Sequence, residues 1–384
     1  MGLPLSIILP FFFLFGTGTM ISAKILMQTK VVNSHGLTVF FERPWFQTLI
    51  MFLAMSLALI KNAIDMKKLK KKHREAQPLL GDNFDKSEKV PGVPEPIVAF
   101  LVAIPATLDL LATTVMSFGL VLISVSVMQC LRAVMIAFAA ILEVFFAKQL
   151  KTEKKIGAQW FGVILAFVGV FFVGYSSVLS GAGADENDND GFAQLIGCLL
   201  VVISQFIQAS QIICERFLLK SHDAPDALVV GCEGGWGSIL CLVVFLPLAQ
   251  LFKHKSWGED VIDDFYVLRT NFHIKVFTGI YFGCILGLNM FGMMITSALS
   301  ATHRTLFEAL RTVAIWVVDL GIYYWISKDF GEAWTIYSYL ELFGFIVLVI
   351  ATLIYNKSLK VPGFFYPTPK ETEDVEEPAR PAEE

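Results

Sequence analysis

The chain contains Gln129-Cys-Leu-Arg132-Ala-Val134 and later repeats this frame as Glu308-Ala-Leu-Arg311-Thr-Val313. Each arginine lies inside an apolar stretch long enough to cross a bilayer, with a polar side chain one helical turn earlier on the same face. A charge at that depth costs from about 2.5 to more than 10 kcal/mol, so it is retained where it faces a bundle interior or a water-filled path. The duplicated arginine therefore predicts a transport path between two structural repeats.

The composition is that of a polytopic helical membrane protein. Of the 384 residues, 55% are apolar and only 17% are charged, and the charges concentrate in a few loops and the tail. The six cysteines form no CxxC or Cys/His spacing and the six histidines form no HExxH, so we predict no metal or other cofactor. No Walker-type phosphate loop is present, and we expect neither an enzyme nor an ATP-driven pump.

Apolar windows of roughly twenty residues predict ten membrane-spanning helices. Their expected bounds are 3–26, 44–65, 95–118, 124–147, 156–179, 193–218, 228–251, 274–299, 304–326 and 335–356. The first has no basic segment before it and is expected to be an uncleaved helix rather than a signal peptide. Very short connections around Ser124–Ser126 and Ser300–Thr302 make the third and fourth spans, and the eighth and ninth, antiparallel neighbours.

The placement of lysine and arginine predicts the orientation in the membrane. The loop after the second span contains a basic run, Lys67 to Arg74, and the loop after the fourth contains Lys148, Lys151, Lys154 and Lys155. The loop after the fifth is acidic, with Asp185 to Asp190 and no basic residue. We therefore expect both basic loops and both termini on the cytosolic side.

The shared frames divide the chain into two halves, and the fold class predicted is an all-α polytopic membrane protein. Trp160-Phe-Gly162 in the first half matches Leu342-Phe-Gly344 in the second. Five spans per half is an odd number, so the two repeats insert with opposite topology. The expected domains are a first five-helix repeat at 1–180 with a cytosolic loop at 66–93, a second repeat at 193–357, and a disordered cytosolic tail at 358–384.

Charged side chains within the spans are the candidate lining of the path. Gln129, Arg132 and Glu143 share one face of the fourth span, and Glu308, Arg311 and Asp319 share one face of the ninth. Such stripes line a cavity that attracts an anionic or polar solute, with the acids as counter-ions or proton carriers. The alternative is that they only form ion pairs that lock the bundle; we favour the cavity because both halves carry the same device.

Three further groups of polar residues lie in or beside the spans. Asp109 follows Pro105, which kinks the third span, and either acts at a gate or pairs with Arg132. Lys24 ends the first span, where snorkelling to the interface is the default interpretation and a role in the path the alternative. The remaining group, expected at the cytosolic rim and more in keeping with capping or surface pairing than with a gate, is Glu215, Arg216 and Glu233.

The basic loop also contains Glu75-Ala-Gln-Pro-Leu79-Leu80, an acidic dileucine pattern of the kind that clathrin adaptors bind. Used as a sorting signal, Glu75, Leu79 and Leu80 would direct the protein to endosomes or lysosomes, with the Golgi as the alternative. The other expected partners are the lipid bilayer and a small-molecule substrate. No nucleic acid is expected, and a homodimer is left open.

Several short stretches, in order and spacing, resemble the drug/metabolite transporter superfamily and, within it, solute carrier family 35, subfamily F, a family that includes nucleotide-sugar transporters. They are Ser22-Ala-Lys24, Met128-Gln-Cys-Leu-Arg132, Gln159-Trp-Phe-Gly162, Cys214-Glu-Arg-Phe217, Gly231-Cys-Glu-Gly234, Leu299-Ser-Ala-Thr302 and Leu310-Arg-Thr-Val-Ala-Ile-Trp316. The resemblance covers nearly the whole chain except 66–93 and the tail. It implies a secondary solute transporter of an endomembrane organelle and leaves the substrate open.

The predicted function is transport by alternating access of a small polar or anionic metabolite such as a nucleotide sugar. The competing function is a non-transporting scaffold or receptor with the same fold. The repeat argues against the scaffold, because a scaffold does not need two intramembrane arginines.

Overall fold

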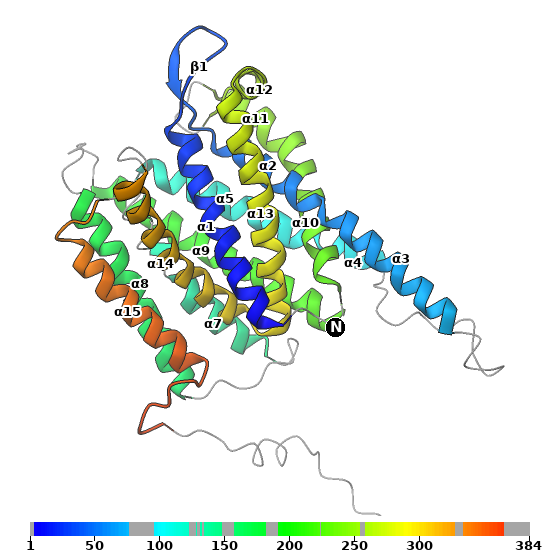
Figure 1. Cartoon of the computed structure of the whole chain (residues 1–384), viewed down its shortest axis with the longest axis vertical. Coiled ribbons are helices and arrows are strands. Elements are labelled where there is room, and N and C mark those ends of the chain that lie inside the picture. The colour runs from blue at the N-terminus through cyan, green and yellow to red at the C-terminus, as the bar shows by residue number, and fades with distance from the viewer. Residues whose placement is uncertain are drawn as a thin grey trace, which may run out of the picture.

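The computed structural model describes residues 4–76, 96–122, 128, 131–132, 134–147, 157–181, 191–222, 224–253, 258–326 and 333–364. Within these ranges the chain is almost entirely helical (Figure 1). The helices are α1 Leu5–Gln28, α2 Pro44–Ser56, α3 Ala58–Ala76, α4 Pro96–Leu101, α5 Ala103–Leu122, α7 Val134–Phe145, α8 Gly157–Gly181, α9 Gly191–Ser221, α10 Asp226–Leu240, the π-helical turn η2 Cys241–Phe245, α11 Leu246–Leu251, α12 Val261–Thr270, α13 Phe272–Ala298, α14 Ala301–Trp325 and α15 Ser338–Tyr355. A two-stranded antiparallel hairpin joins β1 Lys30–Val32 to β2 Thr38–Phe40.

Eight helical segments of the described chain are long and apolar enough to cross a membrane. They are Leu5–Gln28, Pro44–Leu69, Ile97–Gly119, Gly157–Ser176, Leu195–Ser221, Asp226–Leu251, Phe272–Ala298 and Ser338–Tyr355. Two of the ten expected spans do not meet these criteria. The described part of α7 has only 12 residues, and α14, with 25 residues, carries several charges. The all-α polytopic fold class is confirmed, and the count of ten stays a prediction.

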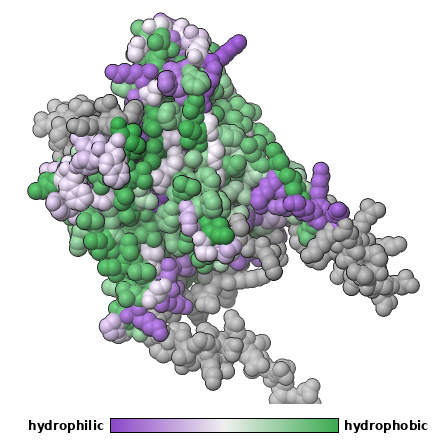
Figure 2. Space-filling view, viewed as in Figure 1, coloured by the Kyte–Doolittle hydropathy of each residue, from purple (hydrophilic) through white to green (hydrophobic). Residues whose placement is uncertain are grey.

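The surface is apolar along the helices and polar at their ends (Figure 2). Side chains such as Phe11, Leu14, Ile164 and Phe171 are exposed on the outside of the bundle, where a soluble protein would carry polar residues. Polar residues gather over the hairpin and α12 and along the projecting end of α3. This distribution fits a bundle whose sides contact lipid.

Four helix pairs make the most extensive contacts of the bundle: α8 with α15, α5 with α9, α1 with α13, and α2 with α10. Figure 1 shows α8 and α15 side by side at one edge and α1 and α13 across the middle. The α8–α15 contact is backbone to backbone. A Cβ on Gly169 would lie 2.9 Å from the Gly344 oxygen, and a Cβ on Gly344 would lie 2.7 Å from the Gly169 oxygen. Small residues allow such close packing where water supplies no hydrophobic drive.

The third expected span is two helices in the structure. Pro105 has no N–H to donate to the Leu101 carbonyl, and the helix is interrupted at Val102, between α4 and α5. The kink predicted from this proline is therefore present as a break. One turn beyond it, α5 carries Asp109 into the bundle interior, where the side chain is 8% exposed.

The helical bundle has two distinct ends. At the N-terminal end, where α1 and α14 both begin, Phe12 packs with Ile295 and Phe307. The opposite end, here called the hairpin end, carries β1, β2 and α12 (Figure 1). These last segments could not be predicted from the sequence, because short amphipathic elements leave no signal in windows sized for membrane spans.

Buried carboxyl groups join the segments of the hairpin end by hydrogen bonds and an ion pair. Glu259 accepts hydrogen bonds from the backbone N–H groups of Trp45 and Phe46 at the start of α2, at 3.0 and 2.8 Å. Arg43 contacts Asp264 at 2.8 Å, and burial together with the nearby Glu259 carboxylate raises the pKa of Asp264 to about 9. Glu259 and Asp264 thus hold a proton at neutral pH.

This proton makes the stability of the hairpin end depend on pH. A carboxyl whose pKa is raised by folding binds more protons in the folded than in the unfolded state, so its contribution to stability falls as pH rises from about 4 to about 9. Asp264→Asn mimics the protonated group and should reduce the fall in melting temperature over this interval, measured in detergent at several pH values. An unchanged slope relative to wild type would contradict the shared proton.

The glycine contact between α8 and α15 gives a second prediction. Gly169→Ala should destabilise the protein by about 1–3 kcal/mol, because the added methyl group forces the two backbones apart. The matched control is Gly279→Ala on α13, where a Cβ meets nothing within 4 Å and the better helix propensity stabilises by up to about 1 kcal/mol. Thermal unfolding of both variants in the same detergent provides the comparison, and equal melting temperatures would show that the contact is not tight.

Candidate functional site

Helix α14 carries a charged face through an otherwise apolar bundle. Ser300 caps the helix by accepting a hydrogen bond from the His303 N–H, which fixes where the helix begins. The side chains of the face follow one another at helical spacing over about 22 Å, which is most of the thickness of a bilayer core. From the N-terminal end to the hairpin end they are Arg304, Glu308, Arg311 and Asp319.

Near the hairpin end, α14 pairs with α1. Lys24 Nζ lies 3.2 Å from Asp319 Oδ2, and the lysine side chain is 29% exposed while that of Asp319 is 8% exposed. The lysine therefore faces another helix of the bundle, which favours the alternative of a role inside the bundle, while snorkelling to the interface stays a prediction. Lys24 and Asp319, both candidates from the sequence, come together here.

In the middle of α14, two of the predicted arginines share one carboxylate. Arg132 and Arg311 each lie within charge–charge range of Glu308, and also of each other. Arg311 Nη1 donates to the Gly16 carbonyl at 3.2 Å, and a Cβ on Gly16 would collide with the arginine side chain. The buried Arg311 Nε has no hydrogen-bond partner in the described part of the chain. Arg132 itself is half-buried.

Arg304, which the sequence analysis did not name, is the most highly connected cation of the bundle's N-terminal end. Its guanidinium contacts Glu308 on its own helix at 3.1 Å and Glu215 on α9 through a short ion pair. The Gln211 amide then donates to Glu215 at 3.0 Å and to Glu233 of α10 at 2.9 Å. A chain of charge-assisted hydrogen bonds thus joins α14, α9 and α10.

A second buried ion pair lies beside the first. Arg216 Nε is 3.5 Å from Glu143 Oε1, and its Nη1 donates to the Thr296 carbonyl at 2.6 Å. Thr302 donates to the other oxygen of Glu143 at 2.5 Å. The side chains of Arg216 and Glu143 are 4% and 0% exposed. Glu143 therefore joins α7 to α9 and α14.

One expectation about this end was wrong. Surface pairing or capping was favoured for Glu215, Arg216 and Glu233, but all three are buried, at 1%, 4% and 1% exposure. One signal was available: Gln211 and Glu215, like Arg304 and Glu308, are four residues apart on a helix, and such pairs mark a polar face. Because the ninth span is predicted to begin at residue 304, Arg304 is expected at the membrane edge. Its pairing with Glu308 inside the bundle is therefore not recognised.

Asp109 does not make the contact with Arg132 that was considered. The charged groups near it are Glu215, Arg304 and Glu308, and no ion pair or hydrogen bond joins the Asp109 carboxyl to another described residue. It thus belongs to the network of the N-terminal end.

The remaining predicted positions lie partly outside the described residues. Gln129 is outside them, as are Leu79 and Leu80 of the dileucine pattern, while Glu75 lies in the last turn of α3. The partner proposed from the sequence for the first arginine, one turn before Arg132, is therefore untested.

Exposure changes along the polar face. Toward the hairpin end Lys24 and Glu308 are 29% and 28% exposed, whereas at the N-terminal end Arg304 and Glu215 are 10% and 1% exposed. Lys24 and Glu308 are therefore more accessible than the ion pair at the N-terminal end, although Asp319 beside Lys24 is only 8% exposed.

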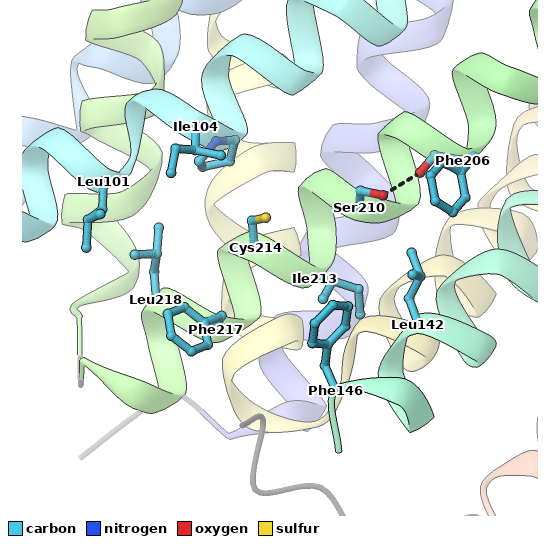
Figure 3. A pocket seen from close by; sticks show the side chains of 11 residues that line it. Leu101, Ile104, Leu142, Phe146, Phe206, Ser210, Ile213, Cys214, Phe217 and Leu218 are labelled. Atoms are coloured by element: carbon cyan, nitrogen blue, oxygen red, sulfur yellow. Dashed lines mark hydrogen bonds between the residues drawn. The ribbon is translucent and has the colours of Figure 1, made fainter. Parts of the chain in front are cut away.

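An apolar pocket of about 440 Å³ lies on a different face of α9 (Figure 3). It is lined by α4, α5, α7 and α9, and it contains no charged side chain. The hydroxyl of Ser210 donates to the Phe206 carbonyl of its own helix, at 2.8 Å, so its proton is not available to a ligand. The pocket is thus separate in chemistry from the charged face of α14.

Comparison with known proteins gives related sequences. Solute carrier family 35 member F6 from Homo sapiens is 28% identical over 268 residues, and the same protein from Rattus norvegicus is 27% identical; each match covers 68% of this chain and 68% of the relative. An uncharacterised protein of Schizosaccharomyces pombe is 26% identical over 265 residues, covering 68% of this chain and 75% of its own length. No family model matches the chain.

A solved crystal structure resembles this fold with a TM-score of 0.52, over 90% of this chain and 96% of that chain. Because the sequences are only 13% identical, this likeness shows the fold alone. The sequence relatives and the apolar helices together agree with the resemblance found in the sequence: the chain is a multi-pass membrane protein similar to members of solute carrier family 35, subfamily F.

Proposed function

We propose that the chain is a secondary transporter that moves a small anionic metabolite, such as a nucleotide sugar, across an endomembrane by alternating access. The observation that carries this is the sharing of one carboxylate by two arginines. Glu308 lies near both Arg132 and Arg311, yet it is already in contact with Arg304. The middle of the path therefore has an excess of positive charge that an anionic group of the solute would balance.

The geometry around Arg311 supports an anionic ligand in more detail. Its guanidinium presents several donors in a fixed plane, a geometry that suits carboxylate and phosphate. Only the bond to Gly16 is made among the described residues, and the Nε donor is unused. A scaffold would be expected to neutralise both arginines fully, which is not the arrangement found.

Reciprocal packing supports the proposal of two inverted five-helix repeats. Exchanging the halves relates α1 to α9, α2 to α10 and α5 to α13, so the pair α1–α13 becomes α9–α5, and α2–α13 becomes α10–α5; all four pairs pack together. The same exchange relates Gly162 to Gly344 and Gly169 to Ala351. It converts the contact of Gly162 with Ala351 into that of Gly344 with Gly169, and both occur. The α7 and α14 segments would then be the remaining spans of a ten-helix fold.

Alternating access assigns a role to each end of the polar face. By the placement of basic residues, the N-terminal end faces the cytosol and the hairpin end faces the lumen. The Arg304–Glu215 and Arg216–Glu143 pairs would form the cytosolic gate, closed in this structure. The Lys24–Asp319 pair would act nearer the lumen, where Lys24 is 29% exposed.

Transport by the two arginines can be tested in proteoliposomes. We expect the wild type to take up at least one member of a radiolabelled panel of nucleotide sugars, and we expect Arg132→Ala and Arg311→Ala each to reduce that uptake about 10-fold or more. The loss follows from removing a charge-assisted hydrogen bond of about 1.5–3 kcal/mol. The matched control is Arg269→Ala, because Arg269 is exposed on α12, away from the path.

Two results would contradict this assignment. Wild-type uptake by both variants, at equal incorporation into the vesicles, would remove the arginines from the path. Failure of the wild type with nucleotide sugars, amino acids and vitamins alike would favour the scaffold.

The proposed organelle has a separate test. If Glu75, Leu79 and Leu80 form a sorting signal bound by clathrin adaptors, then replacing both leucines by alanine should move a fluorescently tagged protein from endosomes and lysosomes to the cell surface. The control changes Pro78 to alanine, which leaves the acid and both leucines in place. An unchanged distribution would exclude the dileucine, and a Golgi location of the wild type would favour the alternative organelle.

A further inference from the structure

Three carboxyl groups surround one guanidinium at the N-terminal end of the bundle. Asp109 comes from α5, Glu215 from α9 and Glu233 from α10, and all three are within charge–charge range of Arg304 on α14. Their exposures are 8%, 1% and 1%. The proposed function uses Arg304 and Glu215 as a gate but gives Asp109 and Glu233 no task.

The charges of this cluster do not balance if every carboxyl group is ionised. Arg304 is in direct contact with Glu215 and Glu308. Neither Asp109 nor Glu233 has an ion pair with a described cation, since the side-chain partner of Glu233 among the described residues is the neutral amide of Gln211. A buried carboxylate without a cation is strongly disfavoured and takes up a proton instead.

Two side chains of the cluster, Asp109 and Gln211, have polar atoms that make no hydrogen bond with the described residues, and both indicate that protons are bound. The Asp109 carboxyl, more than nine-tenths buried, makes no hydrogen bond or ion pair with any described residue. The Gln211 amide donates to Glu215 and Glu233, but its own oxygen is buried and accepts no hydrogen bond from the described chain. A cluster that already has an excess of acceptors therefore lacks donors, and bound protons would supply them.

Among the described residues, Arg304 is the only cation within charge–charge range of Asp109 or Glu233, because the neighbouring Arg216 is paired with Glu143, and Arg132 and Arg311 lie near Glu308. The packing elements contribute neutral groups, which are Tyr281 of α13 near Asp109, Cys214 beside Glu215 and Cys232 beside Glu233. Among the side chains described on α2 and α4, none is titratable. On α3, Lys61 is exposed and pairs with Asp65 instead.

We propose that Asp109 and Glu233 form a proton-binding site behind the cytosolic gate, and that the protons bound there move together with the solute. The coupling part rests on the proposed function. While Arg304 holds Glu215 the site is dry and both carboxyls are neutral. When that contact opens, water reaches the site, the O–H bond of each acid breaks, and the proton passes to cytosolic water and leaves a carboxylate. The protein would thus be driven by a proton gradient that is acidic on the luminal side.

The proton site can be tested without a known solute. Infrared spectra of the full chain in lipid nanodiscs at about pH 7 should contain the carbonyl stretch of neutral carboxylic acids, because exposed Asp and Glu have pKa values near about 4 and are ionised there. Asp109→Asn and Glu233→Gln should each remove one component of this band. Asp65→Asn is the matched control, since Asp65 is exposed and its loss should leave the band unchanged.

The melting temperatures of the variants show whether each variant is folded. Asn and Gln have the shape of a neutral carboxylic acid, so both variants should melt close to the wild type, whereas replacing an ionised partner of Arg304, as in Glu215→Gln, should lower the melting temperature. A wild type without the band at about pH 7, or a band that neither variant alters, would overturn the proton site.

Coupling is measured with the nucleotide-sugar panel in vesicles. A pH gradient should accelerate wild-type uptake, whereas for Asp109→Asn the ratio of uptake with the gradient to uptake without it should fall to about one. A wild type that transports without any response to the gradient would overturn the coupling. If the wild type transports none of the probes, the proposed function fails by itself, and the infrared result still decides whether the site binds protons.

Discussion

The arrangement of the bundle depends on burying Arg304 against Glu215. Each group alone would be prohibitively costly in an apolar interior, and removing one partner of such a pair typically costs 3–5 kcal/mol, about the scale of a protein's whole stability. The contact therefore constrains α9 and α14 to one relative position. Gln211 extends the constraint to α10, and Glu143 extends it to α7. Four helices of the bundle are held at one end by polar bonds, because contact with lipid gives little drive for association.

Packing outside the polar network follows a different rule. The α8–α15 pair has no buried charge at its contact and is held by backbone approach at Gly169 and Gly344. Gly162 makes the same kind of backbone contact with Ala351 farther along the pair. The apolar α8–α15 pair and the polar network therefore have different roles. The pair at the edge can stay fixed while the ion pairs inside the bundle exchange partners. Such a division suits a protein that must open alternately at two ends.

The sequence predicted the helical class, the eight apolar spans and four of the side chains that meet on α14 and α1, because hydropathy and helical periodicity are local properties. Arg304 was missed because its partner Glu215 is 89 residues away, and a window ending at the membrane edge treats such a residue as solvated. The hairpin and α12 were missed for a related reason, since Glu259 and Arg43 stabilise them only through contacts with distant helices. The pairing of charges across helices could not be predicted from local patterns, because the partners are far apart in the sequence.

The polarity along α14 has a consequence for mechanism. Its middle has more arginine than carboxylate, and its N-terminal end has more carboxylate than arginine, while Glu308 and Arg304 belong to both regions. An anion bound to Arg132 and Arg311 would replace Glu308 as their counter-ion. Glu308 could then bind Arg304 more tightly, which weakens the hold of Arg304 on Glu215. Solute binding would thus release Glu308 to Arg304 and favour gate opening, and this exchange of counter-ions, rather than a long-range movement, can connect the two sites.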